Sequence, residues 1–202
     1  MSAAEFVPDT DDPAELRAAA AHCRGCDLYR NATQTVFGEG PRHAPVVMIG
    51  EQPGDREDTA GHPFVGPAGQ LLDRALDEVA IDRDAVYLTN AVKHFKFTER
   101  GKRRIHQQPN RGEITACAPW LTAELAAVRP HLIICLGAIA AQAVFGPSFR
   151  VSRQRGQLLT VDDHRAIATV HPSAVLRAPD REQAYRDFVA DLRIAQQAMT
   201  SP

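Results

Sequence analysis

Three apolar runs in this chain each end in side chains that can do chemistry. The runs span residues 46–49, 86–88 and 166–170, and they are followed by Glu51-Gln52, Asn90 and His171. Ligands of an open parallel α/β sheet bind at the carboxyl ends of its strands. We therefore expect these endings to form one site with a carboxylate, two amides and an imidazole. Such a set suits a small planar polar ligand.

Elements that could position these side chains alternate along the chain. The patterns predict strands at 45–50, 86–90, 132–136 and 167–170, and a bend with a short strand within 150–160. They predict helices at 13–22, 67–80, 111–128 and 180–198, and a further helix after Gly137. The Gly/Pro-rich segment 51–66 is expected to be a loop. This order predicts an α/β fold, a three-layer α/β/α sandwich with a four-stranded parallel sheet, as a single domain over 1–202.

Composition narrows the class of protein. The chain has 202 residues, 44% hydrophobic and 24% charged, which is ordinary for a soluble globular domain. No apolar run reaches the length of a membrane span. The acidic start has neither the basic residues nor the apolar stretch of a signal peptide. We expect a cytoplasmic monomer with no membrane partner.

Positive charge is concentrated in one segment. Residues 93–111 hold seven Lys/Arg and one acid, a balance of +6, whereas the whole chain carries −2. A confined basic segment on an acidic protein indicates a loop that faces phosphate. A solvated, flexible loop is the alternative.

The cysteines suggest a metal site. Cys23-x-x-Cys26 follows a helix, whereas a redox pair would be expected to open one after a strand, so metal ligation is favoured. Cys135 lies in an apolar strand and is expected to be a small buried hydrophobe. Cys117 and His94 complete a candidate set of four. An iron–sulfur cluster accepts His in place of Cys, and zinc with three Cys and one His is the competing metal.

Five ordered motifs and one insert resemble a known family. The motifs are Gly50–Gly54, Gly61–Gly69, Thr89-Asn90, His171–Ser173 and the Cys-x-x-Cys start, and the insert is Lys102-Arg103-Arg104-Ile105-His106. Together they resemble the uracil-DNA glycosylase superfamily over residues 5–198, and the cysteines resemble its iron–sulfur branch. The insert looks like the hallmark of the UdgX subgroup. Members of that subgroup excise uracil and then bond covalently to the DNA.

The resemblance implies a cofactor, and at two positions the sequence differs from other glycosylases of the superfamily. It implies a 4Fe–4S cluster held by Cys23, Cys26, His94 and Cys117. Most iron–sulfur glycosylases of this kind carry Cys where His94 stands, and the plain glycosylases usually have Ala where Gln52 stands. Both departures are as in UdgX, and Gln52 makes ordinary turnover doubtful. We assign Gln52 to both the catalytic and the uracil-binding groups.

The same resemblance suggests how uracil is read once it has left the base stack. Phe64 is the candidate stacking platform, although a core anchor for its loop is equally consistent. Asn90 matches the O4/N3–H edge of uracil and not that of cytosine, although a strand-end cap would also use Asn. His171 is expected to stabilise the leaving uracil anion through O2, although a His-Pro pair can be purely structural.

The insert carries the expected nucleophile. His106 would attack the anomeric carbon in place of water, helped by Glu51, unless it is simply a histidine of a disordered basic loop. Ile105 would pin the loop to the body. DNA contacts are expected from the insert and from a short loop after His171, in which Val175 or Leu176 is either an apolar wedge or packs inward. These DNA-binding candidates are Lys102, Arg103, Arg104, Ser173, Val175 and Leu176. Lys102, Arg103 and Arg104 have bracing of the loop as their alternative role.

The sequence therefore predicts excision of uracil from DNA followed by a permanent histidine–DNA adduct, one per protein molecule. Uracil-containing DNA is the expected partner, preferably single-stranded. A conventional multi-turnover glycosylase is the first rival, and it would release a free abasic product. A non-catalytic module that binds damaged DNA is the second, and it would release no uracil.

Overall fold

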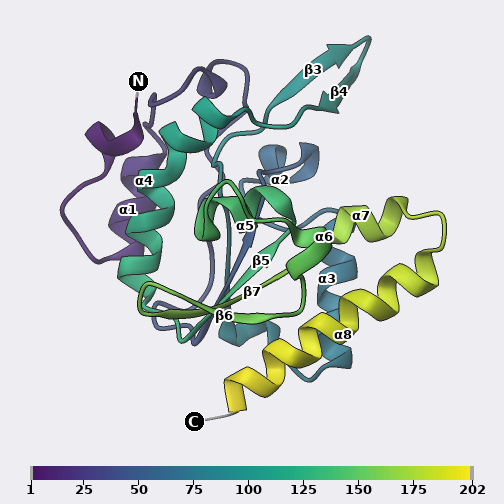
Figure 1. Ribbon diagram of the computed structural model, residues 1–202. Helices are drawn as coiled ribbons and strands as arrows, with labels where there is room; N and C mark the ends of the chain where they lie inside the picture. Colours follow the sequence, from purple (N-terminus) through teal and green to yellow (C-terminus); the bar gives the residue numbers. More distant parts are fainter. Residues whose placement is uncertain (1, 201–202) are drawn as a thin grey trace.

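Five strands form the central sheet, in the order β2-β1-β5-β7-β6. The computed structural model describes residues 2–200, so residues 1 and 201–202 of the expected domain 1–202 lie outside the described part (Figure 1). The strands are β1 (Val46–Gly50), β2 (Val86–Asn90), β5 (Leu132–Leu136), β6 (Leu158–Val161) and β7 (His164–Thr169).

Four of these strands run parallel, as the sequence predicts, and β6 adds a fifth, antiparallel strand at one edge. Only Asp162 and Asp163 separate β6 from β7, and Asp162 has a φ of 49°. A connection this short permits only antiparallel pairing, because parallel neighbours need a long crossover. The sheet is therefore mixed rather than purely parallel.

Helices cover both faces of the sheet, as expected for three layers (Figure 1). Helices α3 (Pro67–Glu78), α7 (Pro172–Arg177) and α8 (Arg181–Thr200) pack on the face that holds Val46 and Met48. Helices α4 (Arg111–Val128) and α5 (Ala138–Phe145) pack on the face that holds Val47 and Ile49. Among residues 2–200, no helix is both long and apolar enough to cross a membrane.

The N-terminal segment forms a further layer on the outside of α4. It contains η1 (Ala3–Phe6), α1 (Pro13–Ala20) and η2 (Asp27–Arg30), and it encloses a third hydrophobic cluster with α4. Asp12 caps α1 by accepting from the backbone N–H of Ala14, and Pro13 opens the helix, as the sequence indicates. Helix α4 begins with a reciprocal capping box between Asn110 and Glu113, and its bounds match the predicted 111–128.

Short helices are the main difference from the expected elements. Helix α2 (Asp55–Ala60) interrupts the expected loop 51–66, α7 occupies the segment expected as a loop after His171, and α6 (Val151–Gln154) precedes β6. A turn η3 (Arg83–Ala85) precedes β2. Helices of four to six residues are too short to display a hydrophobic period, so local hydrogen bonds define them. In α2, Glu57 accepts from the backbone N–H groups of Gly54 and Gly66.

The expected basic loop contains an antiparallel hairpin that projects from the body (Figure 1). Strand β3 (Phe97–Arg100) pairs with β4 (Arg103–His106), and Phe97 lies opposite His106. Gly101 turns the chain at a φ of +61°, which glycine adopts without strain. The hairpin therefore fixes the register of His106, which a disordered loop would not.

Candidate active site

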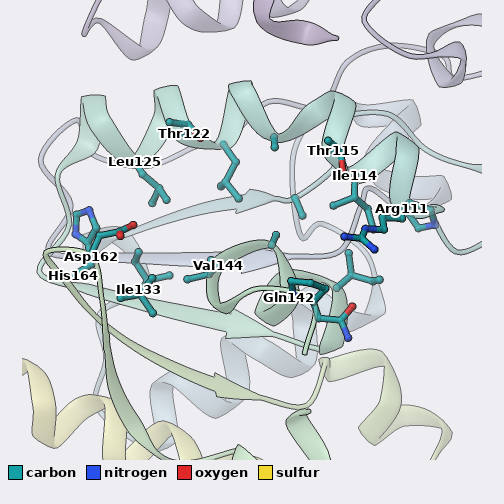
Figure 2. A pocket seen from close by; sticks show the side chains of 18 of the residues that line it. Arg111, Ile114, Thr115, Thr122, Leu125, Ile133, Gln142, Val144, Asp162 and His164 are labelled. Atoms are coloured by element: carbon teal, nitrogen blue, oxygen red, sulfur yellow. The ribbon is translucent and has the colours of Figure 1, made fainter. Parts of the chain in front are cut away.

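The three strand endings and the hairpin meet at one cavity of about 730 Å³. Eight of its lining residues are site residues expected from the sequence: Glu51, Gln52, Phe64, Asn90, His106, His171, Ser173 and Leu176. A second cavity, of about 660 Å³, lies between α4 and the sheet, with Arg111 near one end and Asp162 and His164 near the other (Figure 2). It holds none of the expected catalytic or uracil-binding residues, so the first cavity is the candidate active site.

Phe64 and Asn90 are packed around the last residue of β1. A Cβ on Gly50 would lie 2.3 Å from Asn90 Oδ1 and 2.7 Å from a ring carbon of Phe64, so only glycine allows this approach. Phe64 is held at a φ of 58° and is 7% exposed. Its ring belongs to the core cluster, which agrees with the expected core anchor, and it also lines the cavity. Within residues 2–200, the side-chain amide of Asn90 has no hydrogen-bond partner, which leaves it for a ligand.

A buried ion pair fixes the turn that carries Asn90. Lys93 is fully buried and paired with Glu124, and its ammonium also donates to Thr89 Oγ1 and to the carbonyl of Asn90. The three ammonium protons therefore have three acceptors, which a buried charge requires. Lys93 is accordingly part of the scaffold behind the cavity.

His171 presents a defined tautomer to the cavity. It caps α7, and its Nδ1 accepts from the backbone N–H of Ser173 at 3.2 Å. Burial lowers the pKa of His171 to about 4, and the positive charge of Arg177 adds to this effect. The ring is therefore neutral at physiological pH, with its proton on Nε2. That N–H can donate to a carbonyl oxygen.

Glu51 and His106 lie side by side in the lining of the cavity. His106 Nε2 lies 3.5 Å from Glu51 Oε1, and within residues 2–200 this buried oxygen has no hydrogen-bond partner. Burial raises the pKa of Glu51, and the nearby Arg177 opposes that rise. Burial and the charge of Arg177 both lower the pKa of His106. The imidazole is thus neutral at physiological pH and keeps one nitrogen with a free lone pair.

Gln52 holds the base of the hairpin. Its Nε2 donates to the carbonyls of Lys96 and Gln107, and its Oε1 accepts from the Lys96 N–H. The side-chain amide is therefore taken up by the two strands that lead to and from His106. Catalytic and uracil-binding roles were assigned to Gln52 from the sequence, whereas these contacts make it a positioning residue for the hairpin.

Arg104 braces the hairpin against α2. Its guanidinium pairs with Asp55 Oδ1 and with the fully buried Asp58 Oδ2, each at 2.5 Å, and it lies over the rings of Phe95 and Phe97. Of the two roles expected for Arg104, phosphate contact or bracing, its contacts are those of a brace. Ile105 points the other way and is 41% exposed, so the expectation that it pins the loop to the body is wrong.

The remaining DNA-binding candidates differ in accessibility. Lys102 and Arg103 are exposed at the turn of the hairpin. Val175 is 2% exposed and packs into the core, whereas Leu176 lines the cavity, so of the two possible wedges only Leu176 is available. Ser173 is committed to His171, because its hydroxyl lies 2.8 Å from Nδ1.

Seven of the fifteen residues that line the cavity are not among the expected site residues, and two of the seven are cations. Arg56 on α2 and Arg177 on α7 line the cavity, and both are exposed. Arg177 lies on α7, in a segment expected to be a loop, so no position at the cavity was predicted for it. One sequence signal does indicate this helix: Pro172 follows His171, a residue that can cap a helix. A helix that starts there puts Ser173 and Arg177 on one face.

Three of the four cysteines lie in one hydrophobic cluster, and the fourth lies in another. Cys23, Cys26 and Cys117 lie in the hydrophobic cluster between the N-terminal segment and α4, and each sulfur accepts a backbone N–H. Burial raises the pKa of Cys117 to about 12, although Lys93 opposes the rise. Cys135 lies in a different cluster, where burial is the sole cause of its raised pKa. The expectation that Cys135 is a buried hydrophobe agrees with this position.

His94 also has the form of a ligand. The Thr35 hydroxyl donates to the Ala20 carbonyl, so its oxygen accepts from His94 Nε2–H at 2.9 Å. Burial lowers the pKa of His94 to about 4, which leaves Nδ1 with a lone pair. In metal-binding histidines, the ring nitrogen that does not bind the metal typically makes such a hydrogen bond, which fixes the tautomer.

The described residues do not form a site for a single metal ion. Within residues 2–200, no three or more His, Cys, Asp or Glu side chains are grouped so that they could hold one. Thiolates and a neutral imidazole are donors that both an iron–sulfur cluster and zinc accept, so the donor types fit either group. The buried indole N–H of Trp120, in the same hydrophobic cluster as the cysteines, has no partner among residues 2–200.

Comparisons with known proteins relate the chain to one superfamily. Residues 37–193 match the family model described as the uracil DNA glycosylase superfamily. A type-4 uracil-DNA glycosylase of Archaeoglobus fulgidus is 38% identical over 82% of this chain and 84% of that protein. The type-4 enzymes of Pyrobaculum aerophilum and Saccharolobus solfataricus are 36% and 33% identical, over 83% and 89% of this chain and 86% and 82% of theirs.

Proposed function

The chain belongs to the uracil-DNA glycosylase superfamily, and from that membership we propose that it excises uracil from DNA and then bonds to the sugar through His106. The carrying observation is the position of the His106 imidazole, 3.5 Å from Glu51 in a cavity that also contains Phe64 and His171. Relatives named type-4 uracil-DNA glycosylases support the excision step. The adduct step is proposed from the position of His106 in this chain and not from these relatives.

Uracil recognition follows from the free groups of the cavity. The flipped base would stack on Phe64, and the Asn90 amide would pair with its O4/N3–H edge. Cytosine offers the opposite donor and acceptor pattern there, and each buried group left unpaired costs about 1–3 kcal/mol. Uracil is therefore preferred over cytosine.

Cleavage breaks the bond between N1 of uracil and C1′ of the sugar. The bonding electrons leave with uracil, and His171 Nε2–H stabilises the resulting anion at O2. The sugar becomes an oxocarbenium cation, which the Glu51 carboxylate in the cavity lining stabilises. Both residues therefore act in the transition state, where charge develops.

Capture follows when a ring nitrogen of His106 donates its lone pair to C1′. The new C–N bond makes the imidazole a cation, which becomes neutral by losing the proton on its other nitrogen, while the uracil anion gains a proton. The net reaction converts deoxyuridine and histidine into the adduct and free uracil. An alkylated imidazole is a poor leaving group, so each protein molecule reacts once.

We further propose that a 4Fe–4S cluster is held by Cys23, Cys26, His94 and Cys117. When bound, it would supply covalent links between the N-terminal segment, the Asn90–His94 turn and α4. We propose a cytoplasmic monomer, a single domain over 1–202 and a preference for single-stranded DNA, which spares the cost of opening a duplex.

A denaturing gel tests the adduct. Protein and a labelled oligonucleotide with one deoxyuridine are mixed in equal amounts, with thymidine and deoxycytidine versions as substrate controls. A slow-migrating band that needs uracil, stops at one equivalent and has the mass of protein plus DNA minus uracil is expected. His106→Ser should lose the band, whereas the exposed His43→Ser should keep it.

Three outcomes decide between the proposals. A free abasic product formed over many turnovers by the unaltered protein would establish the conventional glycosylase instead. Retained binding without uracil release would establish the binding module. A His106→Ala variant that still crosslinks would move the nucleophile to another residue.

A further inference from the structure

Two arginines at the cavity have no partner in the protein. Arg56 on α2 and Arg177 on α7 both line the cavity that holds Glu51 and His106. Both side chains are exposed, and within residues 2–200 neither guanidinium makes an ion pair, a hydrogen bond or a ring contact. They come from two different elements, so the cavity carries a free cation on each.

The acids around Arg56 are already committed to other groups. Its neighbour Asp55 pairs with Arg104, and Glu57 accepts from the backbone N–H groups of Gly54 and Gly66. Asp58 is also held by Arg104 and by the Thr33 N–H. Although Arg56 lies within an acidic turn, every one of these carboxylates is satisfied without it. Its charge is therefore available to an external anion.

Arg177 is close enough to act on the reacting groups but does not pair with them. Its charge opposes protonation of both His106 and His171 and favours ionised Glu51. No carboxylate among residues 2–200 lies within ion-pair distance of its guanidinium. Arg177 thus stands at the cavity with its own charge unneutralised.

We propose that Arg56 and Arg177 form a two-sided clamp for the phosphates that flank the target uracil nucleotide. A base that enters the cavity brings its sugar and the two adjoining phosphodiester groups to the rim, each with one negative charge. The planar guanidinium donates two parallel hydrogen bonds to such a group. This inference rests on the proposed function, because the clamp needs a nucleotide as its ligand.

The clamp has a positional role that the hairpin cations lack. Lys102 and Arg103 lie at the turn of the hairpin, away from the cavity lining, and they can meet phosphate anywhere along a strand. Arg56 and Arg177 act only on the nucleotide that enters the cavity. The clamp therefore favours the flipped nucleotide over an ordinary one.

Equilibrium binding to an uncleavable substrate tests the clamp. The probe is a single-stranded oligonucleotide with one 2′-fluoro-2′-deoxyuridine, whose electron-withdrawing fluorine disfavours the oxocarbenium and keeps the base attached. Arg56→Gln and Arg177→Gln should each weaken binding about fivefold. Each should also reduce the slope of log affinity against log salt by about 0.7, the value for one phosphate contact on a single strand. Lysine at either position should preserve the slope, and Arg186→Gln on α8 is the matched control.

Neutral phosphates locate the contacts. A methylphosphonate replaces the phosphate on the 5′ or the 3′ side of the fluorinated nucleotide, and each variant is measured against both probes. One arginine variant should be insensitive to the 5′ replacement and the other to the 3′ replacement, since the contact is already lost. Additive losses for both arginines on both probes, or unchanged salt slopes, would overturn the clamp. Failure of the unaltered protein to prefer the fluorinated uracil over thymine would instead count against the proposed function.

Discussion

Replacing Arg104 with methionine separates the brace of the hairpin from the chemistry of the cavity. Methionine keeps an unbranched apolar stem against Phe95 and Phe97 but removes all the hydrogen bonds of the guanidinium. The lost bonds include the ion pairs to Asp55 and Asp58, both at 2.5 Å. Asp58, with 0% of its side chain exposed, would keep only the Thr33 N–H as a partner.

The magnitude follows from the burial of the two partners. Breaking a fully buried ion pair costs about 3–5 kcal/mol. The Arg104 side chain is 22% exposed and that of Asp55 is 59% exposed, so solvent reduces this cost. Loss of the Arg104 ion pairs should therefore cost about 2 kcal/mol. This corresponds to a factor of about 30 in the equilibrium between the hairpin in place and the hairpin moved away. Adduct formation should slow by about that factor.

Two rates measured in one reaction check this reasoning. Phe64, Asn90 and His171 do not touch Arg104, so uracil release should stay near that of the unaltered protein while the adduct band grows slowly. Alkali-labile abasic product should appear in its place. Arg103→Met removes the same charge from the neighbouring residue of β4 and is the matched control. Equal losses of adduct in both variants, or equal losses of release and adduct in Arg104→Met, would refute the brace.

Three further predictions use the same assays. Gln52→Ala removes three hydrogen bonds at the base of the hairpin, so the ratio of free abasic product to adduct should rise, and an unchanged ratio would contradict its positioning role. Arg177→Gln should raise the pKa of His106, since a nearby cation is lost. Because the neutral imidazole is the reactive form, the acidic decline in the adduct rate should then move to higher pH, and an unmoved decline would exclude this coupling. The purified protein should be brown with iron and sulfide, Cys23→Ala should lose both and Cys135→Ala should keep them, whereas a colourless zinc protein would contradict the cluster.

The parts of the fold with a strong local pattern could be predicted from sequence. Strands β1 and β5 are continuous apolar runs, β2 begins with one, and α4 has an Asn110–Glu113 capping box at its start, so their bounds are close to those expected. Because parallel strands bring their carboxyl ends to one edge, the meeting of Glu51, Asn90 and His171 followed from that order.

The parts set by long-range contacts could not be predicted. Gln52 bonds to backbone groups 44 and 55 residues away, and Arg104 pairs with Asp58 across 46 residues. Sequence spacing carries no record of such pairings. Helices α2 and α7 have six residues each, too few for a hydrophobic period, so Arg56 and Arg177 had no predicted place at the cavity.

In the proposed mechanism, the hairpin decides which nucleophile meets the oxocarbenium. A group held in attacking geometry has an effective concentration of about 10⁵ M or more, far above that of water. Gln52 and Arg104 hold the hairpin that carries His106, so the imidazole should react with the sugar whenever the hairpin is in place. Water should react with the sugar only in the fraction of molecules in which the hairpin has moved. The ratio of abasic product to adduct is then a direct measure of hairpin placement, and the step from a turnover enzyme to a single-use one needs no change in the residues that cleave the bond.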